Sequence, residues 1–513
     1  MGYFEKDASG RCLVWEDFDT VEHTQNKRKY VLAGLMLSTF LAAVEGTVIS
    51  PATPSIVGEF EAASLMSWVF AAYLLTMAIT TPIFGKLSDL FGRKPVFLTG
   101  CLLFIAGSAL CGFAGGMEQL IAFRAIQGIG AGAVIPVTYT IVGDLYKMEE
   151  RGKVQGMISS VWGIASLVGP LLGGYLVDTF SWRWIFGINV PFGLLAVLFI
   201  ALFLKEERTR KKADIDWAGA ATFTIGMTAL LLALTSGGQS AAWNSPLIIG
   251  LLAGSIVMLA AFVWIEQRAS EPLVPLKLFR IRDILFSSIA ALFVSTLLIG
   301  LTTYIPLWVQ GVQQGSAVLS GMLLAPMSFS WIAGSFIAGR MIAKSGARGA
   351  AVIGLAALVA GSAGVALMGS GSPGYVLPLL MLVLGLGFGM SLTVFTIVAQ
   401  SSVGYSMRGA STALNTFLRT LGQTLGVAFF GTLLNASLLS GTGGAASGGA
   451  TEVDINALLS EHTRAEMSAD KLAGLSGVLE NGLHSLFIVM LILTALGLLA
   501  VLPLSKRPPA PRE

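Results

Sequence analysis

The segment that decides the fold is Gly85-Lys86-Leu87-Ser88-Asp89-Leu90-Phe91-Gly92-Arg93-Lys94, a polar stretch between two long apolar runs. A related stretch follows later, Gly339-Arg340-Met341-Ile342-Ala343-Lys344-Ser345-Gly346-Ala347-Arg348. Both place two glycines seven residues apart with basic residues beside them, and both follow an even-numbered apolar run. The two copies therefore have parallel topology, which predicts two helical bundles related by an axis along the membrane normal.

The composition around these stretches is that of a membrane protein. Of 513 residues, 54% are hydrophobic and 12% are charged, whereas an ordinary soluble domain is roughly 25% charged. These values exclude a soluble enzyme and a disordered chain. A net charge of +3 provides no basic field for nucleic acid. The apolar runs are continuous and about twenty residues long, which predicts membrane-spanning helices and not a β-barrel.

The apolar runs number fourteen, and each is long enough to cross a hydrocarbon core of roughly 30 Å. Six precede the first junction, and two form an insertion before the last six. The runs cover 30–51, 64–84, 96–114, 119–142, 157–178, 184–204, 217–235, 246–266, 284–309, 316–338, 350–369, 375–399, 409–436 and 482–504.

Basic residues set the expected orientation. With the N-terminus inside, the inner tails and loops hold 27 of the 32 Lys and Arg residues. The outer loops hold Arg183, Arg464 and Lys471, and the runs themselves hold Arg124 and Arg419. Because Lys and Arg accumulate on the cytoplasmic side, we expect both termini in the cytosol and the protein in the cell (plasma) membrane.

These features predict the domain organisation. The outer loop 437–481 is expected to carry one or two short helices, with Ser468 as an N-cap, or to be a solvated connector. The expected parts are a cytosolic tail (1–29), an N-terminal six-helix bundle (30–204), a basic loop with inserted helices 7 and 8 (205–283), a C-terminal six-helix bundle (284–504) and a cytosolic tail (505–513).

Four motifs in chain order resemble those of one family. The chain is similar to the fourteen-span drug/proton antiporters of the major facilitator superfamily. The resemblance implies an all-α polytopic fold and proton-coupled antiport of lipophilic drugs or toxic compounds by alternating access, hence multidrug efflux and antibiotic resistance. The motifs are 85–94, Arg124-Ala125-Ile126-Gln127-Gly128-Ile129-Gly130, 163–174 with Gly169-Pro170 and Gly173-Gly174, and 178–191 with Trp182-Arg183-Trp184 and Asn189-Val190-Pro191.

The chain departs from the family pattern at two positions. Ala343 in the second loop copy stands where Asp89 stands in the first, so only the first loop supplies that carboxylate. Glu45 stands in the first run where many relatives carry Asp, so the acid is retained with one more methylene.

Charged groups inside the hydrocarbon cost roughly 2.5–3.5 kcal/mol each on insertion scales, so those inside the runs call for an explanation. Glu45 is the acid well inside a run, and it is our candidate for proton coupling and substrate sensing. A static ion pair with Arg124 is the alternative. The resemblance implies that Arg124 tunes Glu45 or relays protons; Arg124 could instead donate to backbone carbonyls. A single acid fits monovalent cations or neutral apolar compounds better than dications, so lipophilic cations are the expected cargo.

We expect an aromatic and polar pocket, because aromatic faces attract organic cations. Packing in the core or against lipid explains each of these side chains as well. Arg419, with Asn415 one turn earlier, could orient substrate or bridge the bundles. The candidate substrate-binding residues are Glu45, Tyr73, Tyr139, Trp162, Tyr304, Trp308, Phe388, Phe395, Asn415, Arg419 and Gln423.

A third group of residues is predicted to form gates. Gly169 and Gly173 allow close helix approach, and Pro170 favours a bend, although generic helix packing accounts for the spacing nearly as well. Asp89 could cap an inner helix end while Arg93 pairs with Asp144. Asp178 and Arg183 lie at the outer membrane edge, where a structural salt bridge is favoured over substrate contact. The candidate gating residues are Gly85, Asp89, Gly92, Arg93, Asp144, Gly169, Pro170, Gly173, Asp178 and Arg183.

Other functions lack their motifs. No Gly-x-x-x-x-Gly-Lys-Ser/Thr sequence occurs, which argues against an ATP-driven pump, and no His-Glu-x-x-His occurs, which argues against an intramembrane hydrolase. The spacing of Cys12, Cys101 and Cys111 suits no metal. We expect a secondary transporter, not an enzyme, without cofactor or metal. Its expected partners are protons, a lipophilic small molecule and the bilayer, as a monomer without nucleic acid. The alternatives are an exporter of a lipid, peptide or metabolite, and a membrane sensor without transport.

Overall fold

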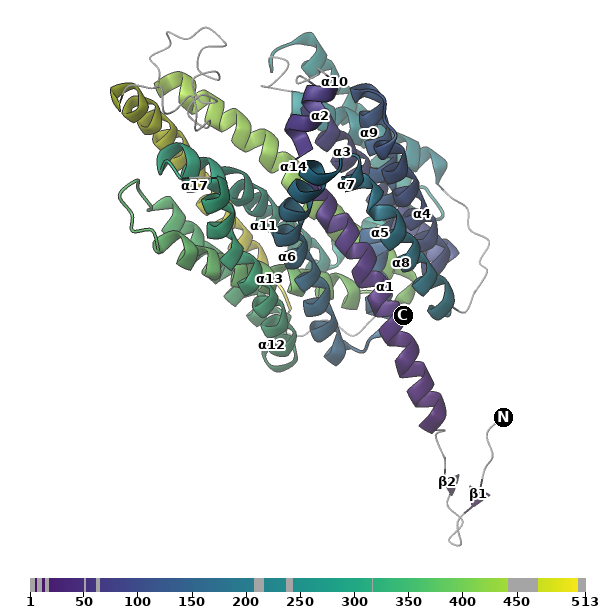
Figure 1. Ribbon diagram of the computed structural model, residues 1–513. Coiled ribbons are helices and arrows are strands. Elements are labelled where there is room, and N and C mark those ends of the chain that lie inside the picture. Colours follow the sequence, from purple (N-terminus) through teal and green to yellow (C-terminus); the bar gives the residue numbers. More distant parts are fainter. Residues whose placement is uncertain are drawn as a thin grey trace.

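The computed structural model describes residues 5–6, 12–13, 18–49, 52–60, 65–206, 216–236, 243–315, 317–441 and 469–505. These residues are nearly all helical (Figure 1). The exception is a short antiparallel pair near the N-terminus, β1 (Glu5–Lys6) with β2 (Cys12–Leu13).

The helices of the first half and of the insertion are α1 (Phe18–Val48), α2 (Thr53–Phe60), α3 (Met66–Phe91), α4 (Arg93–Gly112), α5 (Met117–Leu145), α6 (Met148–Thr179), α7 (Trp184–Gly187), α8 (Asn189–Phe203), α9 (Trp217–Ser236) and α10 (Pro246–Glu266). Those of the second half are the 3-10 helix η3 (Leu276–Arg280), α11 (Arg282–Leu307), the π-helix η4 (Trp308–Val312), α12 (Ala317–Ala366), α13 (Val376–Ser401), the 3-10 helix η5 (Tyr405–Met407), α14 (Arg408–Gly441) and α17 (Ala469–Val501).

Within the described ranges, 13 helices are long and apolar enough to cross a membrane. They correspond to thirteen of the fourteen predicted runs. The remaining run, 157–178, is helical as part of α6, which begins earlier, at Met148. The sequence-based expectation of an all-α, multi-span fold is confirmed.

The internal repeat is visible in the backbone. Gly92 separates α3 from α4 with φ of +98°, and Gly346 interrupts α12 with φ of +81°. These are the two glycines with positive φ in the described part of the chain. Side chains strongly disfavour this conformation, and glycine adopts it freely. The second glycine of each repeat copy is therefore the point at which the chain turns from one helix into the next.

The first glycine of each copy lies at a helix crossing. A Cβ atom on Gly85 would lie 2.1 Å from the Cβ of Ala413 on α14, and one on Gly339 would lie 2.5 Å from the Cα of Gly152 on α6. Small residues let helix backbones approach this closely. The repeat thus pairs α3 with α14 and α12 with α6, each time joining a helix of the first half to one of the second.

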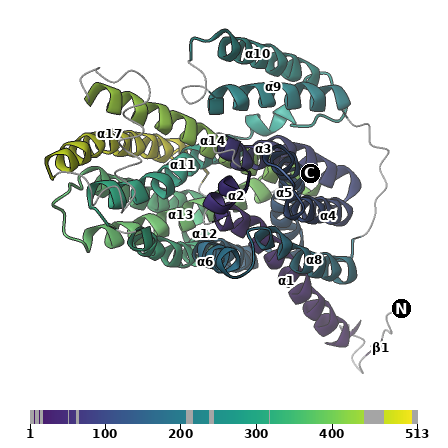
Figure 2. The same ribbon diagram turned by 45° about the horizontal axis from the view of Figure 1, so that its top comes forward.

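Apolar packing follows the same division. One core cluster draws its residues from α11 to α17, including Phe388 and Phe487, whereas two others draw theirs from α1 to α8, including Phe97 and Phe186. The inserted helices α9 and α10 lie side by side, with α9 against α3 and α14 and α10 on the outer side of α9 (Figure 2). Phe223 of α9 belongs to a further apolar cluster with residues of α3, α10 and α14, and its ring contacts rings of α10 and α14.

Two helix boundaries differ from the expectation. α1 begins at Phe18 instead of residue 30. The predicted short helix after Ser468 is the first part of one continuous helix, α17, which begins at Ala469 and includes the predicted run 482–504 up to Val501. Leu479 and Leu483 of that helix are both fully buried in the core of the second half, and no proline interrupts this stretch. Ser468 itself and the rest of 442–468 lie outside the described residues.

Candidate functional site

A buried ion pair joins α1 and α5. Glu45 Oε1 contacts Arg124 Nη1, and the side chains are 0% and 1% exposed. Charges removed from water in this way are costly unless they are paired and hydrogen-bonded. This contact is the one that the alternative of a static ion pair predicts.

Neutral groups complete the shell of the carboxylate. Asn189 Nδ2 donates to Glu45 Oε2 at 2.8 Å and lies 2.9 Å from Ser108 Oγ. Asn189 begins α8, at the end of the motif that contains Trp182-Arg183-Trp184. The role of Asn189 could not be predicted from that motif, because nothing in the local sequence shows that its amide faces α1.

Arg124 has further partners of its own. Its Nη1 donates to Gln127 Oε1 at 2.8 Å, and its Nε donates to the carbonyl of Val69 at 3.1 Å. The guanidinium also lies 4.3 Å from the centre of the Tyr73 ring. Arg124 is therefore both the partner of Glu45 and a donor to a backbone carbonyl.

Tyr73 connects this network to the space between the two halves. Its hydroxyl is buried and has no hydrogen-bond partner among the described residues. Met77, four residues later on α3, lines a central cavity. Four residues are about one helical turn, so the buried network lies about one turn of α3 from that cavity.

The cavity lies between helices of both halves and has a volume of about 110 Å³. Four of the predicted pocket residues line it, namely Tyr139, Trp162, Arg419 and Gln423. The full lining is Met77, Ile135, Tyr139, Gln155, Ser159, Trp162, Leu298, Trp331, Leu392, Thr393, Thr396, Thr416, Arg419, Thr420 and Gln423.

The structure places other predicted pocket residues away from the lining. Tyr304 and Trp308 contact Phe430 and Phe487 in the core of the second half, with ring centres 6.1 and 5.6 Å apart. Phe395 is fully buried in the same core. An aromatic residue in an apolar run carries no signal that separates a core position from a pocket position.

Three predicted residues lie close behind the lining or apart from it. Phe388 stacks on the cavity-lining Trp331, with ring centres 5.5 Å apart. Asn415 is buried, and its Nδ2 has no partner in the described part of the chain. Glu45 is not among the lining residues in this conformation.

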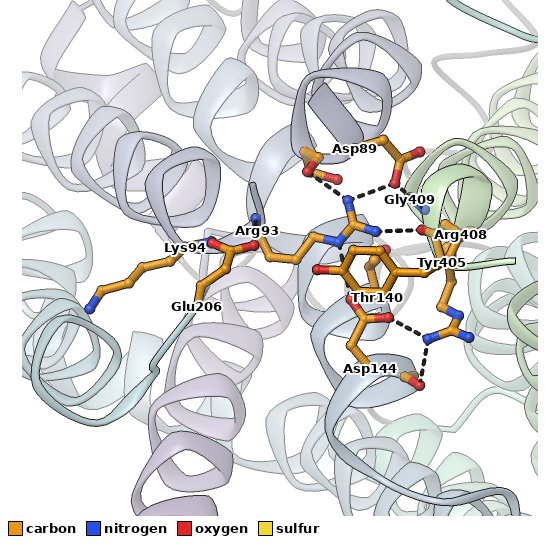
Figure 3. Close-up of polar contacts among 12 residues, drawn as sticks. Asp89, Arg93, Lys94, Thr140, Asp144, Glu206, Tyr405, Arg408 and Gly409 are labelled. Atoms are coloured by element: carbon orange, nitrogen blue, oxygen red, sulfur yellow. Dashed lines mark hydrogen bonds and ion pairs between the residues drawn. The ribbon is translucent and has the colours of Figure 1, made fainter. Parts of the chain in front are cut away.

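A second charged cluster occupies the helix ends around Asp89, here called the Asp89 end (Figure 3). Arg93 Nη1 lies 2.6 Å from Asp89 Oδ1, and Arg93 Nε lies 3.1 Å from Asp144 Oδ2. The guanidinium also donates to the carbonyls of Ser88 and Tyr405, at 2.6 and 2.9 Å. The structure thus contains the Arg93–Asp144 pair that the sequence predicted.

The cluster crosses from one half of the molecule to the other. Asp144 Oδ1 also pairs with Arg408 Nη1, the first residue of α14. Arg408 donates to the carbonyls of Gly143 and Gln400, at 3.0 and 3.2 Å, and Gln400 Nε2 donates to the carbonyl of Tyr139 at 2.7 Å. These contacts hold α5 against α13 and α14 at the Asp89 end.

The repeat, a cavity between two halves and a charged closure at one end are features of a known transporter architecture. Residues 35–427 match the model of the Major Facilitator Superfamily. The chain belongs to the major facilitator superfamily. Its family and fold are therefore those of multi-span membrane transporters, not of enzymes.

Relatives within the superfamily support this assignment. The chain is 37% identical to multidrug transporter protein MdtP of Bacillus subtilis over 415 residues, 81% of this chain and 77% of the relative. It is 35% identical to multidrug resistance protein 3 of the same organism over 497 residues, 95% of this chain and 97% of the relative. The proton:xylose symporter XylE has the same fold, with a TM-score of 0.61 at 16% identity over 93% of this chain and 95% of that one.

Sequence reasoning missed two charged residues at the Asp89 end of this superfamily member. Glu206 accepts hydrogen bonds from the backbone N–H groups of Arg93 and Lys94, at 2.6 and 3.0 Å, and so caps α4. Arg408 closes the cluster from the second half. A signal for Arg408 was present, because Arg408-Gly409 repeats the pair Arg151-Gly152 early in α6.

At the end of the molecule opposite the Asp89 end, Arg183 and Glu59 form an ion pair. Arg183 donates to both oxygens of Glu59, at 3.0 and 2.8 Å, and Trp182 Nε1 donates to Glu59 Oε2 at 2.6 Å. Hydrogen bonds from Arg183 and then from Trp182 hold the pKa of the Glu59 carboxyl below its ordinary value of 4.5. Arg183 thus lies in a salt bridge, with a partner that sequence analysis did not name.

Gly169 and Gly173 pack α6 against α1. A Cβ on Gly169 would lie 2.0 Å from Thr47 Oγ1, and one on Gly173 would lie 2.4 Å from the carbonyl oxygen of Val48. Pro170 and Asp178 are also on α6, but their side chains lie outside the described residues. The glycines therefore sit at a close helix contact within the first half.

Proposed function

We propose that this protein is a proton-coupled antiporter that exports lipophilic drugs or toxic compounds from the cell by alternating access. The observation that carries the proposal is the buried Glu45–Arg124 pair about one helical turn from the central cavity. Ionisable residues in a membrane-spanning helix mark ion or substrate pathways by default. The relatives named as a multidrug transporter and a multidrug resistance protein support a drug as the cargo.

The orientation of the protein follows from its basic loops. Lys86, Lys94, Lys205 and Arg408 all lie at or near the Asp89 end. By the positive-inside rule we assign this end to the cytosol, with both termini inside and the protein in the plasma membrane. The Asp89 cluster is then the closed inner gate of a monomer.

Glu45 would couple the proton to this gate through its pairing with Arg124. In the conformation described, the ionised carboxylate neutralises the guanidinium and accepts from Asn189. A proton that arrives from the outside neutralises the carboxylate and leaves Arg124 without its counter-charge. Because an unpaired buried charge is costly, the loaded state favours a different packing of α1 against α5, and release of the proton inside restores the pair.

The charge of the cargo depends on whether Glu45 reaches the cavity. Competition between a proton and a drug cation for Glu45 requires the carboxylate to reach the cavity. Glu45 does not line the cavity in this conformation. Direct neutralisation of a cation by Glu45 would need a second conformation in which its carboxylate lines the cavity.

The proposal is tested with Glu45→Gln in proteoliposomes that carry an imposed pH gradient and a dye as cargo. We expect dye transport driven by the gradient to fall at least about tenfold, because the amide cannot exchange a proton. Glu118→Gln, at an exposed acid in the first turn of α5, is the matched control and should transport normally. Gradient-driven transport by Glu45→Gln at the wild-type rate would remove Glu45 from the mechanism.

A further inference from the structure

Arg419 is the permanently charged side chain of the central cavity. It lies on α14 about a third of the way along the helix and is half-buried. The other described lining residues are apolar, aromatic, hydroxyl or amide side chains, and none of them is Asp or Glu. The cavity therefore carries a positive charge and no fixed negative charge of its own.

The guanidinium of Arg419 is also unpaired. It forms no ion pair and no hydrogen bond with any other residue that the structure describes. The contrast with the other arginine inside a predicted run is sharp, because Arg124 has a carboxylate, an amide and a backbone carbonyl as partners. A guanidinium inside a membrane-spanning helix requires a counter-charge, and at Arg419 the described residues do not supply one.

Two residues of the same lining carry polar groups without partners. Trp162 and Thr393 line the cavity, and the indole N–H of the first and the hydroxyl of the second are buried and have no partner in the part of the chain that the structure describes. Thr393 is 2% exposed. An indole N–H can only donate. A hydroxyl can donate or accept, and the amide oxygen of Gln155, also without a partner among the described residues, can only accept, so these lining residues carry donors as well as acceptors.

The aromatic residues of the lining suit a flat apolar body. Trp162 comes from α6 and Trp331 from α12, so the two halves each contribute an indole to the cavity. Planar guanidinium groups recognise carboxylates through two parallel hydrogen bonds. A molecule with an aromatic body and a carboxylate would thus satisfy the indoles and Arg419 together.

We propose that the cavity binds lipophilic cargo that carries a carboxylate or a similar anionic oxygen group, with Arg419 as the residue that holds this group. The inference rests on the proposed function only in taking the cavity as the cargo site. It reverses the charge that the sequence alone predicted for the cargo, because the acid predicted to bind cations lies outside the lining.

The test is a binding measurement without any gradient. The purified full chain in nanodiscs of zwitterionic lipid is titrated with 1-naphthoate, 1-naphthamide and 1-naphthylmethylammonium, which share an aromatic ring and differ in charge. We expect the carboxylate to bind at least about tenfold more tightly than the amide, since hydrogen bonds to charged groups are the stronger ones. The cation should bind most weakly.

Variants assign this preference to one residue. Arg419→Gln should weaken binding of 1-naphthoate by about 10- to 100-fold and leave 1-naphthamide nearly unchanged, while Arg419→Lys should lie between. Arg280→Gln, at an exposed arginine of η3, removes the same charge outside the cavity and should match the wild type. If Arg419→Gln does not fold, the order of the three probes on the wild type still decides.

Several results would overturn the inference. These are equal or weaker binding of 1-naphthoate relative to 1-naphthamide, no binding of any probe, or an unchanged preference in a folded Arg419→Gln protein. Loss of 1-naphthoate binding when phosphatidylglycerol is added to the nanodiscs would assign Arg419 to a lipid headgroup instead. Failure of the antiport proposal is distinguishable, because it would abolish gradient-driven flux and leave the binding preference intact.

Discussion

Asp89 on α3 caps the first turn of α14, where its Oδ1 accepts a hydrogen bond from the backbone N–H of Gly409 at 2.9 Å. Its Oδ2 accepts a second, from Ala410, at 2.7 Å. The first N–H groups of a helix have no partner within the helix, and a carboxylate near them is favoured by the helix dipole. One side chain thus joins a helix of the first half to a helix of the second, and this contact must break when the Asp89 end opens.

Asp89→Ala is therefore expected to shift the protein toward states open at the Asp89 end. The loss of two hydrogen bonds to a charged group corresponds to about 1.5–3 kcal/mol each at most, enough to change a conformational population severalfold. Spin labels at exposed Phe91 and Ser406, read by double electron–electron resonance, should show a larger share of long distances. Glu118→Ala is the control, and an unchanged distribution in Asp89→Ala would contradict the capping role.

Asp144 neutralises two arginines at once, Arg93 at 3.1 Å and Arg408 in direct contact. Asp144→Asn would leave these two cations facing each other, so it should lower thermal stability more than Arg408→Gln does. In the double variant the two changes should be less than additive, with a coupling energy of about 0.5–3 kcal/mol. Strictly additive melting shifts would mean that the pair does not interact in the membrane.

Gly173 and the adjacent Gly174 offer a matched test of the α1–α6 contact. A Cβ on Gly173 would lie 2.4 Å from a backbone oxygen of α1, whereas one on Gly174 would have no atom within 4 Å. Gly173→Ala should destabilise by about 1–3 kcal/mol, as overpacking does, and Gly174→Ala should be neutral or stabilising because alanine favours helix. Scanning fluorimetry of both proteins decides, and equal melting temperatures would argue against the contact.

The Glu59–Arg183 pair predicts a pH dependence of stability. Because the pKa of Glu59 is below its ordinary 4.5 in the folded protein, the pair stabilises the fold above pH 4.5 and loses this contribution as the pH falls through the lowered pKa. The difference in melting temperature between wild type and Glu59→Gln should be constant near neutral pH and shrink in acid. The effect is small, below about 1 kcal/mol, since the pair is largely solvent-exposed. A difference that grows in acid would have the wrong sign.

Much of the fold could be predicted because its signals are local. The length of an apolar run determines whether a helix can span the bilayer, and the glycine pairs at 85/92 and 339/346 mark where the chain turns. The buried pair of Glu45 and Arg124 was also foreseeable, since two opposite charges at a similar depth in one bundle have few other partners. The Arg93–Asp144 contact could also be predicted from the sequence, as a pair of opposite charges at helix ends.

The side chains that line the cavity could be predicted less well than the fold. Aromatic residues in the apolar runs look alike in the sequence whether or not they line the cavity. Tyr139 and Trp162 line it, whereas four others pack in the core of the second half or behind the lining, namely Phe388, Phe395, Tyr304 and Trp308. A hydrophobic run faces neighbours on every side in a membrane bundle. Its periodicity therefore does not indicate which face meets the gap between the halves.

The sequence by itself determined the helical membrane class, the parallel repeat and the superfamily, because hydropathy and glycine spacing act over a few neighbouring residues. Only the tertiary structure decided that Glu45 is paired with Arg124 outside the cavity lining while Arg419 lines the cavity without a partner among the described residues, because the pairing of charges depends on contacts between helices that are far apart in the sequence.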